Sequence, residues 1–234
     1  MPVLQTVQML GLIGMGSYAF SRLVTGSRIV SYQRSRLLAV PVSAMPAMPR
    51  GYRVVALSLE ALAQEALAGH AIDVGPDVQA KRFKSGATCL AAYNDREVLV
   101  GVMWLAAGAY DEDDTHVRYL LADNAGWDTG LWIVPAYRMS RALSALWAGA
   151  AEWLRARGLA WSVSKIADYN WRSIHAHRRM QPVFLGHFTV VRFGSWQITT
   201  RGRPVLARVS LLRRTCISID VEHPIARMPA PRAS

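Results

Sequence analysis

The middle of the chain alternates between short apolar runs and polar turns, a pattern typical of a β-rich domain. Apolar runs of strand length lie at 52–58, 117–122, 129–134, 159–166, 183–194 and 195–200. Residues 87–106 contain two such runs around Asn94-Asp95-Arg96, which predicts a hairpin. Residues 28–42 show strand-type alternation in part of their length.

Three further segments have the apolar spacing of helices. In 139–157 the apolar positions recur every three or four residues, at Leu143, Leu146, Trp147, Ala150, Trp153 and Leu154. Residues 59–69 and 170–180 predict two shorter helices, and Gly69 and Gly158 stand where helices end. The order of these elements predicts an α/β (α+β) fold, with a mixed, mostly antiparallel twisted sheet of about six to seven strands flanked by helices.

Composition divides the chain into three parts. Residues 43–51, "SAMPAMPRG", contain two prolines and a glycine and predict a linker. We therefore expect an N-terminal extension with this Pro-rich linker at 1–50, the main domain at 51–200 and a basic C-terminal tail at 201–234. Residues 1–21 carry no charge, but glutamines, glycines and hydroxyl side chains dilute their apolar run. A packed or surface helix is the favoured interpretation, and weak membrane contact through residues 1–24 is the alternative.

Charge is distributed unevenly along the chain. Residues 1–134 contain 11 Lys/Arg and 12 Asp/Glu, whereas residues 135–234 contain 16 Lys/Arg and 4 Asp/Glu. The basic second half predicts an anionic partner, although biased genome composition is an alternative source of the total charge. Cys89 and Cys216 are too few for a disulfide framework, and no Cys/His cluster has zinc-ligand spacing. We expect a cytoplasmic protein without a metal.

Four stretches, in order, carry a resemblance to a known family: "YRVVALSLEAL", "AAYNDREVLVGVMWLA", "WIVPAYRMSRALSAL" and "ADYNWRSIHAHRRM". Over roughly residues 52–200 the chain resembles the GCN5-related N-acetyltransferases. The resemblance implies an N-acyltransferase that moves an acyl group from acetyl-CoA, or from an acyl-CoA with a longer chain, to an amine acceptor. The acceptor would be a small molecule or a peptide whose amine attacks the thioester directly.

The resemblance also implies a binding site for the donor. In the family, backbone groups of a splayed strand pair with the pantetheine arm, and here that strand would present Trp132, Ile133 and Val134. The pyrophosphate would lie on the backbone N–H groups of a turn and helix N-terminus, here Arg138, Met139, Ser140, Arg141, Ala142 and Leu143. The family turn reads Gln/Arg-x-x-Gly-x-Gly/Ala, so Arg141 and Leu143 stand where glycine or another small residue is usual. Either the Arg141 guanidinium supplies donors to the phosphates, or the turn is an ordinary helix start.

The helix at 170–180 supplies the other implied site. Asn170 and Ser173 stand at the Asn and small-residue positions of the family helix, and His177 stands where a tyrosine often protonates the leaving thiolate. His177 is therefore a candidate general acid, with a packing or surface histidine as the alternative. The family's Gly-Phe pair after this helix is replaced by Gln181-Pro182.

The general base is less well marked. Asp128, directly before the strand "TGLWIV", is the first candidate, and Asp123 and His116 are lesser ones. The acidic run 111–114 favours a solvated loop, which could also attract a cationic acceptor. Four tryptophans, Trp104, Trp127, Trp132 and Trp147, either line the groove or belong to the core, and the core is favoured.

Other interpretations remain open. The missing glycines motivate a degenerate domain of the same fold that binds without catalysing, and the basic half motivates an N-acyltransferase that takes its acyl group from an acidic acyl carrier protein. Nucleic-acid binding is less favoured, because no helix-turn-helix, zinc-finger or RNA-recognition signature is present. No Walker turn, dinucleotide fingerprint or Gly-x-Ser-x-Gly turn supports another enzyme class. A homodimer is compatible with the sequence.

Overall fold

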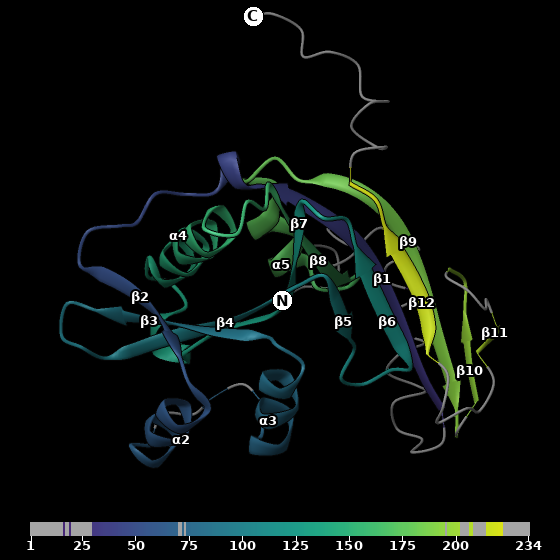
Figure 1. Ribbon diagram of the computed structural model, residues 1–234, viewed down its shortest axis with the longest axis horizontal. Helices are drawn as coiled ribbons and strands as arrows, with labels where there is room; N and C mark the ends of the chain where they lie inside the picture. Colours follow the sequence, from purple (N-terminus) through teal and green to yellow (C-terminus); the bar gives the residue numbers. More distant parts are fainter. Residues whose placement is uncertain are drawn as a thin grey trace, which may run out of the picture.

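A large twisted sheet dominates the computed structural model, which describes residues 30–69, 72, 74–194, 196–201, 206–207 and 214–221, together with 16 and 19. The sheet has nine strands in the order β11-β10-β9-β1-β8-β7-β4-β3-β2, and a second sheet has the order β12-β6-β5 (Figure 1). The predicted mixed, mostly antiparallel sheet is thus confirmed, and it is larger than expected because strands from outside 51–200 join it.

The strands of the large sheet are β1 (Val30–Pro41), β2 (Tyr52–Leu57), β3 (Thr88–Asn94), β4 (Leu99–Ala107), β7 (Ala125–Ile133), β8 (Trp161–Ala167), β9 (Val183–Phe193), β10 (Trp196–Thr199) and β11 (Leu206–Ala207). Those of the small sheet are β5 (Ala109–Asp111), β6 (Val117–Leu121) and β12 (Thr215–Ile219). The helices are α2 (Leu59–Leu67), α3 (Pro76–Lys84), α4 (Ala142–Arg155) and α5 (Trp171–Arg178), with 3-10 turns η1 (Val42–Ala44) and η2 (Pro135–Tyr137).

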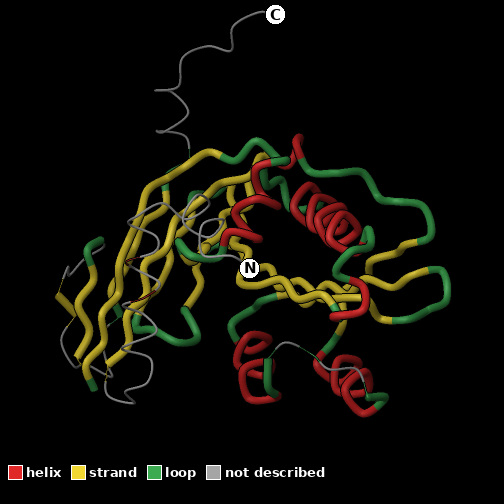
Figure 2. Tube along the Cα trace, turned by 180° about the vertical axis from the view of Figure 1, so that it is seen from behind, coloured by secondary structure: helices red, strands yellow, loops and turns green. Residues whose placement is uncertain are grey.

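The part of the large sheet that contains β2, β3 and β4 is covered on both faces (Figure 2). On one face α4 packs its apolar stripe onto β2, β3 and β4, and Leu146, Ala150 and Leu154 are fully buried there. On the other face lie residues of α2, α3 and the small sheet, in a core that contains Trp104, Trp127 and many other apolar side chains. Burial on both faces explains why β4, "LVGVMWLAA", is an almost continuous apolar run rather than an alternating one.

One parallel strand pair positions the site. β7 and β8 pair in parallel from Ala125 with Trp161 to Asp128 with Ser164, and the ladder stops there. β7 continues to Ile133 against β4 alone, after a bulge in which Thr129 has no partner on β4. A bulge bends its strand and raises the local twist. β7 and β8 therefore separate beyond Asp128, as the family resemblance implied.

The division at Gly51 differs from the structure. β1 lies inside the large sheet, with Ser35–Pro41 paired to β8 and Val30–Ala39 paired to β9. The Pro-rich residues 45–50 connect this strand to β2 rather than joining an outer extension to a domain. At the other end, β12 pairs in parallel with β6, so part of the predicted tail belongs to the small sheet. Strand partners so distant in the sequence leave no local signal.

Two predictions on residues 1–24, a packed or surface helix and weak membrane contact, concern residues that lie outside the described ones apart from 16 and 19. Within the part of the chain that the structure describes, no helix is both long and apolar enough to cross a membrane. α3 was not predicted, because its sequence "PDVQAKRFK" is mostly polar. Pro76 begins this helix, and Gln79 and Arg82 are its buried residues.

Candidate active site

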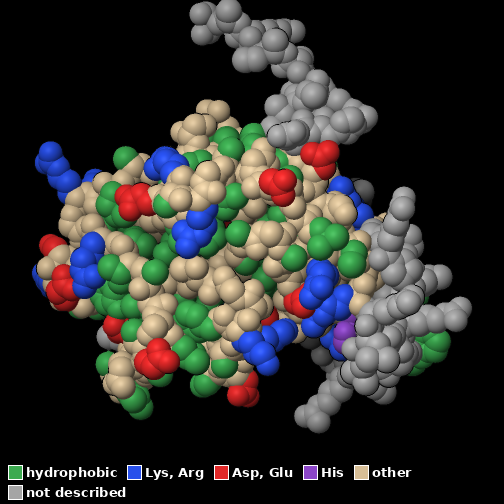
Figure 3. Space-filling view, viewed as in Figure 1, with side chains coloured by type: hydrophobic (Ala, Val, Ile, Leu, Met, Phe, Trp, Pro, Cys, Tyr) green, Lys and Arg blue, Asp and Glu red, His purple; other side chains and the backbone are tan. Residues whose placement is uncertain are grey.

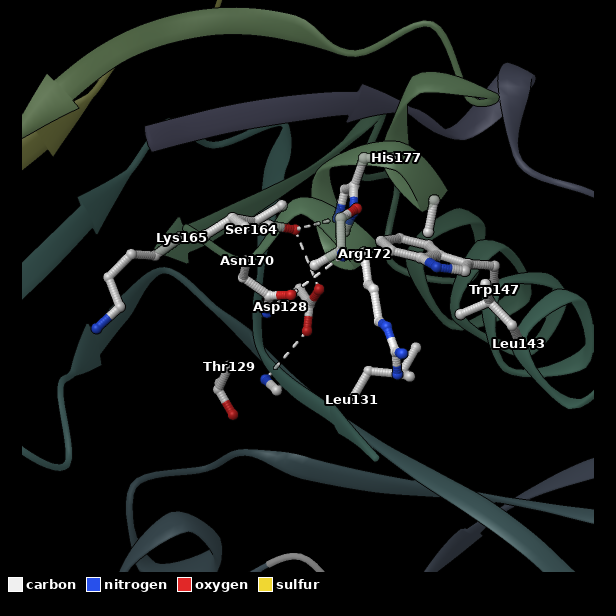
Figure 4. A pocket seen from close by; sticks show the side chains of 14 residues that line it. Asp128, Thr129, Leu131, Leu143, Trp147, Ser164, Lys165, Asn170, Arg172 and His177 are labelled. Carbon is white, nitrogen blue, oxygen red and sulfur yellow. Dashed lines mark hydrogen bonds between the residues drawn. The ribbon is translucent and has the colours of Figure 1, made fainter. Parts of the chain in front are cut away.

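A cavity of about 360 Å³ opens where β7 and β8 separate (Figure 4). Its walls come from β7, β8, the start of α4 and α5, and the residues that line it are Asp128, Thr129, Gly130, Leu131, Leu143, Trp147, Ser164, Lys165, Ile166, Asn170, Arg172, Ser173, Ala176 and His177. Two candidates chosen independently from the sequence, Asp128 and His177, thus face the same cavity.

A serine hydroxyl joins these two candidates. Ser164 Oγ lies 3.0 Å from Asp128 Oδ2 and 3.3 Å from His177 Nε2. The second oxygen of Asp128 accepts a hydrogen bond of 3.0 Å from the Gly130 N–H. Figure 4 shows the three side chains converging from β7, β8 and α5. Together they form a continuous hydrogen-bonded chain, which we call the Asp128–Ser164–His177 relay.

The partners of each atom restrict where the protons of the relay lie. His177 Nδ1 is 2.8 Å from the Ser173 carbonyl oxygen, which only accepts, so Nδ1 carries a hydrogen. The Ser164 hydroxyl has one hydrogen to share between Asp128 and Nε2. If Asp128 is ionised, it accepts from Ser164, whose oxygen can accept from a protonated Nε2, and if Asp128 is protonated, it can donate to Ser164, which then donates to Nε2. Both states contain the same number of protons, so the relay can pass one proton from end to end.

The surroundings of Asp128 favour its protonated form. Its carboxyl group is packed among protein atoms, although the residue keeps some contact with the cavity, and this loss of hydration raises its pKa. A positive charge on His177 and the hydrogen bonds from Ser164 and the Gly130 N–H act in the opposite direction. A carboxylate with a raised pKa holds a proton more readily, as a general base near neutral pH requires.

Packing holds His177 at its place in the cavity wall. The histidine is 5% exposed and its ring meets the Trp147 ring edge-on, with 5.2 Å between centroids. The helix that carries it begins at Asn170, whose side chain accepts from the Ser173 N–H at 3.3 Å. The predicted roles of Asn170 and Ser173 in cofactor binding stay predictions. The structure gives both of them a part in positioning His177.

Buried ion pairs fix the corner between β8 and α5. Asp168 is 3% exposed and receives Arg34 Nε at 3.1 Å and Arg36 Nε at 3.0 Å, both from β1. His187 of β9 lies 3.3 Å from the same carboxylate. Charged hydrogen bonds with little access to water hold a fixed geometry. This clamp therefore ties the start of α5 to the sheet.

A larger cavity of about 830 Å³ adjoins the first. The two share Leu143, Trp147, Arg172 and Ala176. The larger one lies between the end of β7, the start of α4 and α5, and its lining residues are Ala44, Pro46, Ile133, Arg138, Met139, Leu143, Ser144, Trp147, Trp171, Arg172, His175, Ala176, Arg179 and Met180. This lining combines apolar side chains with four basic ones and contains no carboxylate, so it suits an elongated, partly apolar anion.

The turn before α4 has ordinary backbone geometry despite its missing glycines. Arg141 precedes the helix with φ −83° and ψ 9°, a conformation open to any residue. Its side chain forms no cap, and Ser140 Oγ accepts from the Ala142 N–H at 3.2 Å. The N–H groups of Leu143 and Ser144 belong to the first helical turn, where N–H groups have no intrahelical partner. Glycine is therefore not needed for the shape of this turn, and the side chains bear only on how closely an anion approaches.

The structure distributes the other predicted cofactor residues unevenly. Ile133, Arg138, Met139 and Leu143 line the larger cavity, whereas Trp132, Val134, Ser140, Arg141 and Ala142 line neither. For Val134 the prediction of free backbone groups is wrong. Its N–H donates to the Val100 carbonyl at 3.0 Å, and its carbonyl accepts from Tyr137 at 2.8 Å. Val100 of β4 and the 3-10 turn that follows thus occupy the two backbone groups of Val134, so pairing with a bound arm is left to earlier residues of β7.

The lesser candidates for a general base lie elsewhere. Asp123 is exposed in the turn before β7, and neither it nor His116 lines either cavity. The N–H of His116 donates to the Gln197 side chain at 2.9 Å, and burial lowers the pKa of its ring. Among the three candidates for a general base, only Asp128 lines a cavity.

Three of the four residues in the acidic run form ion pairs, and only Asp114 is exposed. Asp111 pairs with Arg118 at 2.7 Å, Glu112 with Lys165 at 2.6 Å and Asp113 with Arg82 at 2.8 Å. Figure 3 shows acidic and basic side chains interspersed on the face in view. These ion pairs connect the β5–β6 segment to β6, β8 and α3, so the acidic charge is largely compensated within the protein.

The tryptophans divide between core and site. Trp104 and Trp127 are buried core residues, and Trp127 stacks on Tyr119 with 4.1 Å between ring centroids. Trp132 packs against the same core, and Trp147 alone of the four lines the cavities. The favoured interpretation as core residues is confirmed for Trp104 and Trp127.

Two functional candidates escaped the sequence analysis. Ser164 lies within the strand "LAWSVSKI", where a serine carries no chemical signal. Its parallel register with Asp128 is what brings the two together, and that register follows only from the fold. Arg172 lines both cavities, and its side chain extends from α5 towards Leu131 of β7 (Figure 4). Within the described part of the chain, no group of three or more His, Cys, Asp or Glu side chains is arranged to hold a metal ion.

Comparison with known proteins shows that this chain is similar to solved structures in fold. No protein-family model and no curated protein matches the sequence. Among solved structures, a functionally unknown conserved protein from Staphylococcus epidermidis matches with a TM-score of 0.51 and 12% identity, over 70% of this chain and 63% of that one. A putative acetyltransferase of the GNAT family from Novosphingobium aromaticivorans matches with a TM-score of 0.47 and 16% identity, over 70% and 65% of the two chains.

A third structure, a GCN5-related N-acetyltransferase from Kribbella flavida, matches with a TM-score of 0.43 and 19% identity, over 74% and 63% of the two chains. In all three the match spans less than two thirds of the other protein. Three features of the chain itself identify the fold: the parallel strand pair β7 and β8 that separates, the helix α4 after the first of these strands, and the short helix α5 after the second. The fold is thus of the GCN5-related N-acetyltransferase type.

Proposed function

We propose that the protein is an N-acyltransferase that moves an acyl group from acetyl-CoA, or from a longer acyl-CoA, to the amine of a small molecule or peptide. The observation that carries the proposal is the Asp128–Ser164–His177 relay, which lies at the point where β7 and β8 separate and beside a groove suited to an elongated anion. A transfer of this kind needs a base for the amine and an acid for the thiolate, and the relay supplies one at each end.

The relay accounts for every proton of the transfer. The amine nitrogen forms a bond to the thioester carbon, and the carbon–sulfur bond breaks. Asp128 accepts the proton that the amine loses, while His177 gives its Nε2 proton to the leaving thiolate. Ser164 then accepts the proton of Asp128 and passes its own to His177, which restores the starting state without solvent. No proton is gained or lost by the protein over a turnover.

The larger cavity is the binding place for the donor in this proposal. Its apolar lining suits the pantetheine arm and the acyl chain, and Arg138, Arg172 and Arg179 supply positive charge for the phosphates. The helix dipole at the start of α4 adds to this field. Because Leu143, Trp147 and Arg172 border both cavities, a thioester that extends from the larger cavity reaches the relay in the smaller one.

The test combines binding with turnover. Purified protein is titrated calorimetrically with acetyl-CoA and longer acyl-CoAs, and is then incubated with a panel of amines while thiol release and acylated amine are measured. We expect saturable binding that free CoA competes, thiol release that requires an amine, and a kcat for Asp128→Asn and His177→Gln lower by about 10²–10⁴-fold. Turnover that both variants retain at the wild-type rate would remove the relay from the mechanism.

A second candidate is a domain of this fold that binds the donor without catalysing. The observation in its favour is that Arg141 and Leu143 place side chains where a close phosphate cradle has small residues. Saturable binding of acyl-CoA without thiol release for any amine would favour this candidate. Absence of binding at millimolar acyl-CoA and of turnover with any thioester would contradict both.

A further inference from the structure

The mouth of the larger cavity is a concentrated basic surface. It is formed by two segments, the turn 138–141 and the helix α5 with its C-cap Arg179. Their exposed basic side chains are Arg138, Arg141, Arg172, His175, Arg178 and Arg179. Four of them line the cavity, and Arg141 and Arg178 stand beside these on the same two segments. We call this set the arginine rim.

The charge of the arginine rim is not compensated within the described part of the chain. None of its arginines forms an ion pair with a described carboxylate. By contrast Arg34, Arg36, Arg82 and Arg118 each pair with an aspartate at 3.1 Å or less. Exposed charges of one sign, gathered around a cavity mouth, attract a partner of the opposite sign.

An apolar side chain in the middle of the rim points to a protein partner. Met139 lies between Arg138 and Ser140 and is 99% exposed. Methionine and arginine are enriched at protein–protein interfaces. A phosphate-binding site uses charged groups and N–H donors, and a methionine side chain supplies neither. The rim thus combines the features of a docking surface with those of an anion site.

The turn itself is less suited to a pyrophosphate than to a single phosphate group. Arg141 and Leu143 carry Cβ atoms at the positions where the resemblance expects glycine or another small residue, so two adjacent phosphates meet more crowding than one. CoA brings its charge as a pyrophosphate and a further phosphate. The same phosphopantetheine arm attached to a carrier protein has one phosphodiester, and the remaining negative charge lies on the surface of the carrier.

We infer that the donor substrate is an acidic carrier protein, which docks on the arginine rim and inserts its acylated phosphopantetheine arm into the larger cavity. The inference rests on the proposed function. The reaction is otherwise unchanged: the amine nitrogen bonds to the acyl carbon, the bond from this carbon to the arm's sulfur breaks, His177 protonates that sulfur and Asp128 receives the amine proton. Acyl-CoA carries the same arm and serves as a poorer donor.

The test compares three donors with the same octanoyl group: an acyl carrier protein of fatty-acid synthesis, CoA, and N-acetylcysteamine, which has the thioester without any phosphate. We expect kcat/KM for the carrier to exceed that for CoA at least tenfold and to fall steeply with ionic strength. The variant Arg178→Glu changes a rim residue that lines neither cavity. It is expected to raise KM about tenfold for the carrier and to leave turnover of the N-acetylcysteamine thioester unchanged.

The matched control is Arg96→Glu, the same charge reversal at the exposed turn between β3 and β4, which should change none of the three rates. Equal or better use of acyl-CoA, with no effect of Arg178→Glu on the carrier, would overturn this inference and leave the proposed function standing. Absence of turnover with all three donors, in the presence of the amine panel, would overturn the proposed function and this inference with it.

Discussion

Asp128 and His177 are bound to the same hydroxyl group. One comes from β7 and the other from α5, and they meet at Ser164 Oγ over distances of 3.0 Å and 3.3 Å. Because the hydroxyl has a single hydrogen and His177 Nδ1 is occupied by a carbonyl, the hydrogen bond that Ser164 makes to one end is linked to the one it makes to the other. The two residues are therefore expected to behave as one kinetic unit.

Double substitution tests this unit. Asp128→Asn and His177→Gln should each lower kcat by about 10²–10⁴-fold, and the double variant should be no slower than the slower single one. Steady-state kinetics of the three variants with a saturating donor gives the comparison. Asp123→Asn, a carboxylate outside both cavities, is the control and should keep the wild-type kcat. Losses that multiply in the double variant would show two independent groups.

Removal of the connecting hydroxyl gives a separate prediction. Ser164→Ala should lower kcat at least tenfold while calorimetry shows unchanged donor binding, because proton return from Asp128 to His177 is interrupted. The matched control is Ser162→Ala, which removes another buried hydroxyl from the same strand and outside the relay. A loss in Ser162→Ala as large as that in Ser164→Ala would assign the effect to packing.

The raised pKa of Asp128 predicts a dependence of stability on pH. The unfolded carboxyl titrates near its ordinary value of 3.8 and the folded one at higher pH. Ionisation of Asp128 therefore opposes folding, with no cost below pH 3.8 and a cost that grows as pH rises through the folded pKa. Asp128→Asn removes this cost and should therefore raise Tm at pH 7, on a scale of roughly 2–4 °C for each 1 kcal/mol in a chain of this length.

Thermal unfolding of both proteins between pH 3 and pH 8 measures this difference. The advantage of Asp128→Asn is expected to shrink as pH falls and to vanish below pH 3.8. A difference in Tm that is the same at every pH would mean that the ionisation of Asp128 is not its source.

The Arg141→Gly substitution separates two roles of the turn. The arginine lines neither cavity, so its loss removes a Cβ from the start of α4 and one charge from the arginine rim. Calorimetric affinity for acyl-CoA should stay the same or rise, while KM for an acylated carrier protein should rise several-fold. Weaker binding of acyl-CoA would instead show that the guanidinium holds the phosphates, and no change with either donor would argue against a phosphate site at this turn.

Close packing of α4 on β2 gives a prediction on stability. A Cβ added at Gly149 would lie 2.4 Å from Val54 Cγ1 and 2.7 Å from Val54 Cβ. Alanine favours a helix over glycine by about 1 kcal/mol, but overpacking typically costs 1–3 kcal/mol. We expect Gly149→Ala to lower the free energy of unfolding in urea. Combined with Val54→Ala it should cost less than the sum of the two single changes, and an additive result would contradict the contact.

Local patterns in the sequence led to much of the site. The strand, turn and helix around Trp132–Trp147 were predictable because apolar periodicity and the Pro135-Ala136-Tyr137 turn are local features. Asp128 and His177 were chosen for their chemistry and for their places at the start of one element and within another. Their connection was not predictable, because Ser164 reaches Asp128 only through the register of β7 with β8.

The number of strands was underestimated for a related reason. β1 pairs with strands more than a hundred residues away, and β12 joins β6 across a similar separation. Such pairings are decided by the assembled sheet, whereas the prolines at 46 and 49 gave a strong local signal for a boundary. The acidic run was misjudged similarly, since its partners Lys165, Arg82 and Arg118 lie on other elements.

The position of β1 also has a consequence for how the chain is made. Val30–Pro41 is synthesised before its two neighbours in the sheet, β8 and β9, which follow only after more than a hundred further residues. Until then the nascent protein carries a strand with both edges unpaired, a state prone to wrong pairing and aggregation. Such long sequence separation between contacting strands also slows folding. Completion of the sheet around β1 is therefore expected to be a late event in biogenesis, and chaperone assistance would be most useful before β9 emerges.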